Sequence, residues 1–122
     1  ANIHAGGLRY QGAGVIISQL IKDNMMHGVD IPQLESFDAS ILFARTEGII
    51  PAPESGHAIA AAIREAKKCK ESGEEKVILF NLSGHGLIDM TAYDSYINGD
   101  LRNYTVTDAE IRKNLENVPH II

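Results

Sequence analysis

The chain has 122 residues, of which 44% are hydrophobic and 22% charged, and its formal net charge is −5. This length allows one domain at most, and the composition is that of an ordinary globular protein. The negative charge argues against a nucleic-acid-binding surface and against docking on anionic membranes, because both need clustered Lys and Arg.

Cysteine use and the lengths of the apolar runs bear on the compartment. Cys69 is the only cysteine, so an internal disulfide is excluded and a reducing, cytoplasmic setting is expected. No apolar run approaches the roughly 18 residues of a membrane span, and no signal peptide is visible. The chain starts at Ala1 in a stretch dense in glycine. We interpret this start as a cut through a longer chain; a processed or tagged start is the alternative.

The first half of the chain contains two segments with apolar residues at helical spacing. The spacing predicts helices over Gly14–Asn24 and Glu35–Thr46, and Gly48 ends the second of them. Between these helices, Val29–Ile31 is predicted to be a short strand. Ile49–Pro53 is predicted to be extended, because each proline moves the residue before it toward the β region.

The clearest predicted helix begins near Pro53 and ends at Gly73. Pro53 and Glu54 suit the first turn, and the lysines near the other end suit the negative end of the helix dipole. The spacing places five apolar residues on one face, opposite charged ones. That face consists of Ile59, Ala62, Ile63, Ala66 and Cys69.

The second half predicts one buried strand and two short helices. Val77–Phe80 is apolar without alternation, which is typical of a strand buried on both faces in a parallel sheet. Asp89 can cap a helix through Tyr96, and Thr107–Glu110 is a capping box for a last helix that Pro119 closes. Helices alternating with a buried strand predict an α/β fold. Because few strands are present, we expect a partial parallel sheet flanked by helices.

The segment Asn81–Gly86, directly after the predicted buried strand, is the first candidate site. Ligands bind beyond the carboxyl ends of strands in open α/β sheets, and glycines let a backbone approach them closely. Ser83 offers a hydroxyl there. A plain glycine turn is an equal alternative. A hydrolase using Ser83 with His85 and Asp89 is disfavoured, because no nucleophile elbow surrounds the serine.

Glu47 is the second candidate, because it precedes the proline-stiffened segment Ile49–Pro53. Its carboxylate could face a pocket and adjust the protonation of a ligand. The alternative is a carboxylate at the solvated end of a helix. Glu54 and His57 have the spacing of a di-iron helix pair, but a second such pair is missing, so a metal site is not expected there.

Three segments together resemble the tryptophan synthase β-chain family. They are His4–Tyr10 (HAGGLRY), Phe43–Ala58 (FARTEGIIPAPESGHA) and Phe80–Gly86 (FNLSGHG). Their order and spacing match the family, and the resemblance extends over essentially the whole chain. Arg9 stands where the common type has aspartate, and His85 stands where it has arginine. Both replacements point to the second, long type of β chain.

The resemblance implies an α/β fold of the fold-type II, pyridoxal-phosphate-dependent class. Such enzymes join L-serine or O-phosphoserine to indole to give tryptophan, and the family implies a homodimer and leaves room for an α subunit. Residues 1–122 would be the C-terminal segment of such a chain. The family's Schiff-base lysine and phosphate loop lie upstream of it. We therefore expect the segment to form one wall of the cofactor pocket and to be inactive alone.

The resemblance also assigns roles to individual positions. Ser83, with Gly84 beside it, would bind the pyridine nitrogen of pyridoxal phosphate, and Glu47 would lie next to the ring in a supporting catalytic role. Arg9 would contact the substrate, where its positive charge suits an acidic leaving group such as that of O-phosphoserine. A monovalent cation would be held by backbone carbonyls around Tyr10 and Gly12.

One other function remains open. A naturally truncated homologue would be a non-catalytic binding or assembly module. Its exposed sheet edge would then pair with another copy or with a separately made N-terminal half.

Overall fold

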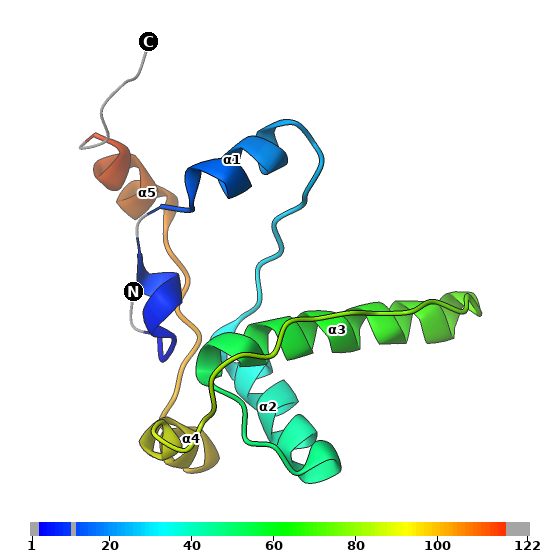
Figure 1. Cartoon of the computed structure of the whole chain (residues 1–122). Helices are drawn as coiled ribbons and strands as arrows, with labels where there is room; N and C mark the ends of the chain where they lie inside the picture. Colours follow the sequence, from blue (N-terminus) through cyan, green and yellow to red (C-terminus); the bar gives the residue numbers. More distant parts are fainter. Residues whose placement is uncertain (1–2, 11, 117–122) are drawn as a thin grey trace.

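The computed structural model describes residues 3–10 and 12–116. These residues form helices and no strand (Figure 1). In chain order the elements are the 3₁₀-helix η1 (Gly6–Arg9), α1 (Val15–Lys22), α2 (Gln33–Glu47), α3 (Pro53–Ser72), α4 (Met90–Ile97) and α5 (Asp108–Leu115). All five α-helices that the sequence predicts are therefore confirmed. Pro119, expected to close the last one, lies outside the described residues.

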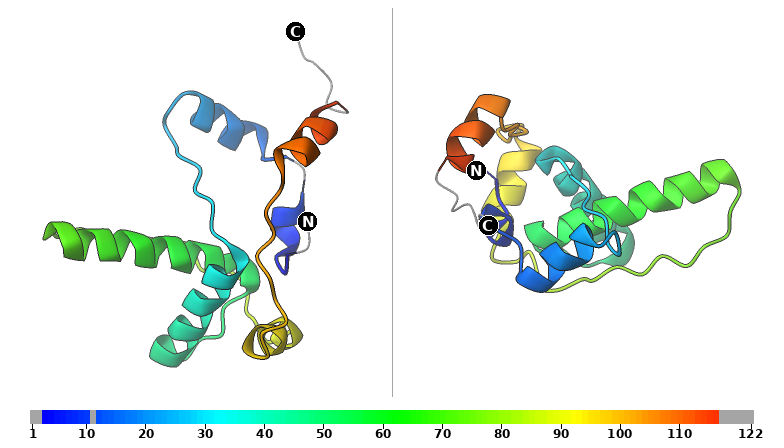
Figure 2. Two further views of the ribbon diagram at one scale, coloured as in Figure 1. Left: turned by 180° about the vertical axis from the view of Figure 1, so that it is seen from behind. Right: turned by 90° about the horizontal axis from the view of Figure 1, so that it is seen from above.

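The helices α2 and α4 and the first half of α3 pack together, and we call these three parts the packed junction. The long α2–α3 contact dominates it, and α4 packs on the other side of α2. The helices α1 and α5 stand apart and pack against no other helix of the described chain (Figures 1 and 2). The outer half of α3 projects away from the junction.

The start of α2 is capped by a residue far away in the sequence. Its N-cap, Pro32, has no side-chain acceptor, so the first-turn N–H groups need another partner. Asn103 Oδ1 accepts the Leu34 N–H at 3.0 Å. The other end is closed locally, because Gly48 adopts a left-handed φ of 71° and its N–H bonds to Ala44 O.

The two long helices cross closely because Gly56 lies at their contact. A Cβ atom at this position would lie 2.3 Å from Ser40 Oγ and 2.6 Å from Ser36 Oγ. The absence of a side chain therefore lets the backbones approach. Ile59, only 2% exposed, and Ala39 fill the space beyond the glycine. Burying such side chains stabilises the contact by about 1.5–3 kcal/mol for each large one.

An ion pair links the same two helices at the surface. Arg64 Nε donates to Glu35 Oε1 at 2.6 Å, and a second bond joins the other guanidinium nitrogen and carboxylate oxygen. The guanidinium also donates to Asp30 O. The bond from Arg64 holds the pKa of the Glu35 carboxyl below its ordinary value. Because both side chains are more than a third exposed, the pair contributes little to stability.

Aromatic rings join α2 to α4. Phe37 lies edge-on to Tyr93, with ring centroids 5.1 Å apart, and stacks on Tyr96 at 5.5 Å. The Tyr96 hydroxyl donates to the Asp38 carboxylate. Burial and this carboxylate raise the pKa of Tyr96 to about 12. Leu101, just after α4, completes the cluster.

The predicted strands do not form. Residues 76–80 return alongside α3 as an extended segment (Figure 1). Val77 is 99% and Leu79 93% exposed, so the described residues do not show the predicted strand buried on both faces. Only Phe80 packs well, edge-on to Phe43 at 6.1 Å. A strand needs a neighbouring strand for its backbone hydrogen bonds, and the described residues offer none. Val29–Ile31 is likewise no strand.

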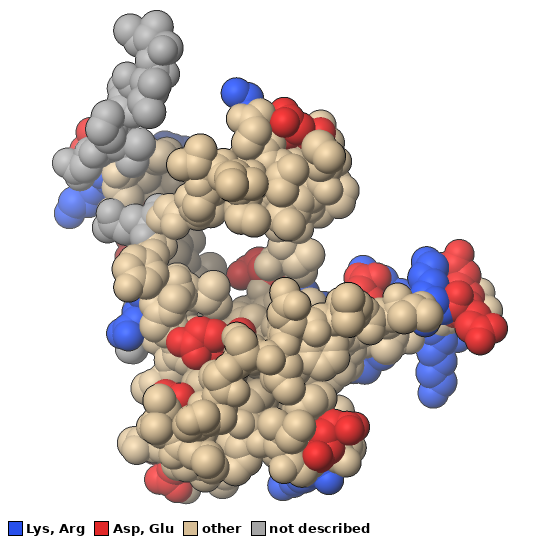
Figure 3. All heavy atoms as spheres, viewed as in Figure 1, with Lys and Arg blue, Asp and Glu red and all other residues tan. Residues whose placement is uncertain are grey.

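The exposed surface is large for the size of the chain. It amounts to 9681 Å², whereas a compact monomer of the same mass exposes about 6,500 Å². Figure 3 shows Lys, Arg, Asp and Glu gathered at the outer end of α3, while much of the remaining face carries no charge. Across the described residues, no helix is both long and apolar enough to cross a membrane.

Candidate functional site

The N-terminal end of α3 is the meeting point of segments far apart in the sequence. The Gly6 N–H donates to Glu54 Oε1 at 2.6 Å and ties η1 to the first turn. From the loop before α4, the Gly86 N–H donates to Ile50 O at 2.8 Å. The three segments singled out in the sequence thus converge on one helix end.

Ser83 is held there by its backbone. Ser55, buried on the first turn of α3, donates its hydroxyl to Ser83 O at 2.7 Å and accepts the Ser83 N–H at 3.3 Å. The next residue, Gly84, has a left-handed φ of 69° and lies against Ala52. The Ser83 side chain is exposed, and its hydroxyl has no hydrogen-bond partner in the described part of the chain. The loop therefore presents a free hydroxyl from a fixed backbone.

The far side of the loop is fixed by Gly86 and Tyr93. A Cβ atom at Gly86 would lie 2.4 Å from Pro51 O, so only glycine fits this approach. The Tyr93 hydroxyl donates to the same Pro51 carbonyl at 2.6 Å. Burial, with a smaller contribution from the Asp89 carboxylate, raises the pKa of Tyr93. The phenol therefore remains a neutral donor at ordinary pH.

Glu47 lies elsewhere, at the last residue of α2. It is exposed and borders an apolar hollow of about 390 Å³ whose walls include Phe43, Ile59 and Phe80. Glu47 is thus both beside a hollow and at an exposed helix end, and its role stays a prediction. Within the described chain, no hydrogen bond or ion pair joins Glu47 to the loop of Ser83.

Arg9 and the expected cation loop belong to η1 and the residues that follow it. Arg9 is the last residue of η1 and is exposed, and Tyr10 is exposed as well. A Cβ atom at Gly12 would meet nothing within 4 Å. Gln11 between them lies outside the described residues. Within the described residues, no hydrogen bond or ion pair joins Arg9 or Tyr10 to Ser83, and the cation loop stays a prediction.

The side chains of the disfavoured metal pair have structural partners. Glu54 accepts the Gly6 N–H, and His57 Nδ1 lies 2.9 Å from Pro53 O and 3.2 Å from Ser36 Oγ. In residues 3–10 and 12–116, no group of three or more His, Cys, Asp or Glu side chains could hold a metal ion.

The hydrolase alternative lacks its central contact. His85 Nδ1 accepts the Leu87 N–H at 3.3 Å and makes no bond to Ser83. An activated serine requires a base within hydrogen-bond reach.

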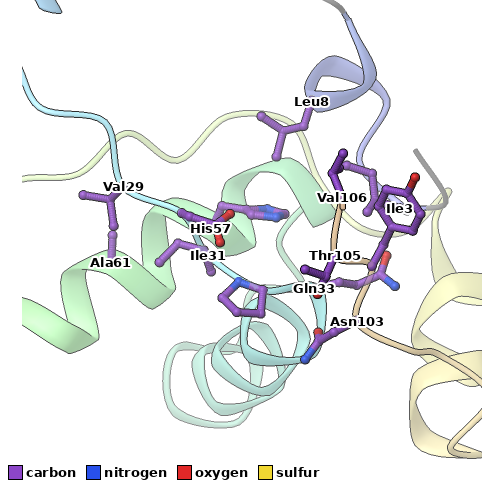
Figure 4. Close-up of a pocket in the computed structure, with 13 residues that line it drawn as sticks. Ile3, Leu8, Val29, Ile31, Gln33, His57, Ala61, Asn103, Thr105 and Val106 are labelled. Atoms are coloured by element: carbon purple, nitrogen blue, oxygen red, sulfur yellow. The ribbon is translucent and has the colours of Figure 1, made fainter. Parts of the chain in front are cut away.

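A cavity of about 720 Å³, which no sequence pattern indicated, lies between η1, α3 and residues 103–106 (Figure 4). Its walls are mostly apolar, with Gln33 and His57 among them. The amide of Gln33 already has partners, accepting the His4 N–H at 2.8 Å and donating to Arg102 O at 3.0 Å. Gln33 therefore links the segments around His4 and Arg102 to the start of α2. No periodicity or motif at this position could have indicated such a contact.

Comparisons with known proteins place the sequence of the chain in a family. A family model described as pyridoxal-phosphate dependent enzyme matches residues 1–84. The chain belongs to the pyridoxal-phosphate dependent enzyme family. It is 61% identical over 99 residues to tryptophan synthase beta chain 2 of Aquifex aeolicus (strain VF5), which is 81% of this chain and 23% of that protein.

Two further relatives agree. Tryptophan synthase beta chain 2 of Methanosarcina mazei is 62% identical over 81% of this chain and 22% of its own length. The protein of the same name from Pyrococcus abyssi (strain GE5 / Orsay) is 47% identical over 90% of this chain and 25% of its own length. The resemblance drawn from the three segments is therefore confirmed, and the chain spans about a quarter of the length of these relatives.

The described residues offer pyridoxal phosphate a hydroxyl for its ring, but only exposed lysines for its aldehyde. The free hydroxyl of Ser83 suits a ring nitrogen, because it can donate or accept a hydrogen bond. A lysine that bonds the cofactor's aldehyde near neutral pH needs a desolvated site. Every lysine of the chain is exposed, namely Lys22, Lys67, Lys68, Lys70, Lys76 and Lys113.

Proposed function

We propose that the chain is the C-terminal segment of a tryptophan-synthase-type β chain and supplies one wall of its pyridoxal-phosphate pocket. The supporting observation is the docking of the Ser83 loop on the first turn of α3, which leaves the hydroxyl free. This contact joins the middle and last of the three family-like segments. A hydroxyl without a protein partner on a fixed backbone is suited to receive a ligand.

In this proposal Ser83 binds the ring nitrogen of the cofactor. Pyridoxal phosphate, when bound, supplies an electron-withdrawing ring and an aldehyde that bonds amino groups. A neutral hydroxyl can hydrogen-bond the nitrogen without forcing its full protonation, and so it moderates the electron demand of the ring. Gly84 has no side chain and adds no bulk beside the hydroxyl.

Two charged residues have supporting roles in the proposal. Glu47 lies near the ring and favours replacement at the substrate's β carbon over competing reactions. Arg9 contacts the amino-acid substrate, L-serine or O-phosphoserine, and its positive charge favours the acidic leaving group. Indole is the proposed acceptor. A monovalent cation at the carbonyls around Tyr10 and Gly12 belongs to the same proposal.

The fold-type II architecture extends the proposal to residues 76–80. These residues become a strand of a parallel sheet whose other strands belong to the rest of the parent enzyme. Ile78 and Phe80 help to line the hollow between α2 and α3, whereas Val77 and Leu79 are bare. A segment covered on one face only is what we expect of a strand whose neighbouring strands and second covering layer are absent.

The partners follow from the same reasoning. We propose that the missing N-terminal half completes the pocket, that the parent is a cytoplasmic homodimer, and that an α subunit is an optional further partner. The family's names for its members, which specify a beta chain, support the last point.

A reduction experiment tests the proposed function. The chain is mixed with pyridoxal phosphate and reduced with borohydride, and its intact mass is measured. The mixture is then repeated with the N-terminal part of a close relative. We expect no stoichiometric adduct on the chain alone, and one adduct on a lysine of the N-terminal part in the mixture, with tryptophan formed from serine and indole.

A single adduct on one of the chain's own lysines would contradict the proposal, because the chain would then hold its own cofactor site. Lys76 is the informative control, since it lies nearest in sequence to the candidate loop and pairs with Glu74 at 2.5 Å. The variant K76A should leave the absence of an adduct unchanged.

A second candidate function is the assembly module. The exposed apolar side chains of Val77 and Leu79 favour it. As such a module, the chain would self-associate through this segment without the N-terminal half. Sedimentation of the chain alone separates the two functions. A stable dimer that the variant L79K dissolves would support a self-associating module, and a monomer would leave only the module that pairs with a separately made N-terminal half.

A further inference from the structure

We infer that Ser55 is a positioning residue that aims the Ser83 hydroxyl. The effect on the cofactor rests on the proposed function, whereas the contact between Ser55 and Ser83 does not depend on it. One buried side chain makes both backbone contacts of Ser83, at 2.7 Å to the carbonyl oxygen and 3.3 Å to the amide nitrogen.

The side-chain direction of a residue follows from its backbone. Once the N–H and C=O of Ser83 are both held, the position of its Cβ atom is set, and only rotation about χ1 remains. Ser55 can set that backbone because it is only 6% exposed and lies on the first turn of a long helix. Pro53 stiffens the same turn.

The loop has little else to orient it. The segment before it is extended, and Val77 and Leu79 are almost fully exposed. Downstream, the Gly86 N–H bonds to Ile50 O. Upstream, Phe80 packs edge-on to Phe43. Without Ser55, no hydrogen bond of the described residues would hold the backbone between Phe80 and Gly86, and the Ser83 hydroxyl would sample many directions.

Ser55 is not explained as a helix cap. The N-cap of α3 is Ala52, and no side chain caps the helix from there. Serine near a helix start commonly bonds its own backbone. The Ser55 hydroxyl instead bonds Ser83, 28 residues away, and makes no bond within α3. Its contacts thus serve the loop.

The first test measures the contact in the chain alone. Amide hydrogen exchange at Ser83 is followed by NMR in the wild type and in S55A. We expect about fivefold faster exchange or more in S55A, the size expected for one lost hydrogen bond. The matched control is S40A, which removes a buried hydroxyl of the same helix contact that bonds Ser36 O instead. Unchanged exchange in S55A would overturn the inference.

The second test measures the consequence for the cofactor. In the complex with the N-terminal part, the absorbance band of bound pyridoxal phosphate is compared among variants. We expect S55A to shift the band in the direction of S83A, S55T to restore it by keeping a hydroxyl, and S40A to leave it in place. A wild-type band in S55A, beside a shifted band in S83A, would overturn the positioning role.

The two tests fail in different ways. If the wild-type complex binds no cofactor, the proposed function is wrong, and the exchange measurement still decides whether Ser55 holds Ser83. If the cofactor binds but neither S55A nor S83A shifts its band, the wall formed by the loop is not where the ring nitrogen lies, and both proposals fall. Circular dichroism of each variant confirms that the helices persist.

Discussion

Apolar side chains are buried in the packed junction, whereas similar side chains in the outlying segments are exposed. In the junction, Phe37 and Ile59 are each 2% exposed. Outside it, Val15 is 87% and Val77 99% exposed, although both are equally apolar. The difference lies in the partners, since the junction finds its complementary faces within this chain. Local sequence decides where a helix forms, whereas burial requires a second surface.

The helix α1 makes the point most clearly. Five of the eight residues in its sequence, VIISQLIK, are apolar and lie mostly on one side, which is typical of a helix with one buried face. In the described chain it packs against no other helix. Under the proposed function, the rest of the parent enzyme would cover this helix; the chain spans 23% of its Aquifex aeolicus relative.

The largest predicted effect contrasts one residue from each region. Ile59→Ala should lower the free energy of unfolding of the junction by about 2–5 kcal/mol, because it leaves a cavity between α2 and α3. Val77→Ala should change it by less than about 0.5 kcal/mol, since an exposed side chain loses almost no contacts. Urea unfolding followed by circular dichroism measures both. Equal losses would show that the two regions do not differ in packing.

Two glycines sharpen the comparison at the candidate site. Gly86→Ala places a methyl group against Pro51 O and should cost about 1–3 kcal/mol by overpacking. Gly28→Ala, outside the junction, meets nothing within 4 Å and should be neutral or slightly stabilising. Thermal unfolding of the two variants is the measurement. A midpoint for Gly86→Ala at the wild-type value would mean that the loop is not docked on Pro51.

A smaller effect tests whether α5 is independent of the junction. Thr107 and Glu110 form a reciprocal capping box at its start. Thr107→Ala should destabilise α5 by about 1 kcal/mol and reduce its helical NMR chemical shifts over residues 108–115. The shifts of α2 should stay unchanged, because α5 packs on no other helix of the described residues. Coupled losses in α2 would reveal a contact between the two regions.

The last predicted effect depends on pH. Burial and Asp38 raise the pKa of Tyr96 from an ordinary value of 10.0 to about 12. Between these values the folded chain keeps a proton that the unfolded chain releases, so stability is full below pH 10 and falls as the pH rises toward 12. Tyr96→Phe should flatten this fall, while Tyr10→Phe, in which the exposed ring is changed, should not. Alkaline unfolding curves of the two variants decide between them.

The helices could be predicted from sequence because their signals are local. The capping box at Thr107, the glycine stops at Gly48 and Gly73, and the proline at the start of α3 all act within one turn. The strand at residues 76–80 could not be predicted in the same way. Its apolar run is typical of a strand covered on both faces within a sheet, and the described residues do not supply that sheet.

In the candidate site too, residues in local motifs could be predicted, whereas residues that act through distant contacts could not. Ser83 and Glu47 could be singled out because each belongs to a family-like motif, although their roles remain proposals. Ser55 could not be recognised, since its hydroxyl acts on a carbonyl 28 residues away. Gln33 was missed for the same reason, because its amide joins segments that only the folded chain brings together.

The most direct measurement is hydrogen exchange at residues 76–80, with and without the N-terminal part of the parent enzyme. The account predicts fast exchange in the chain alone, strong protection of these amides in the complex, and little change in α2. Protection already present in the chain alone would contradict it, as would a complex in which residues 76–80 stay unprotected, because the segment would then not be a strand awaiting its neighbours.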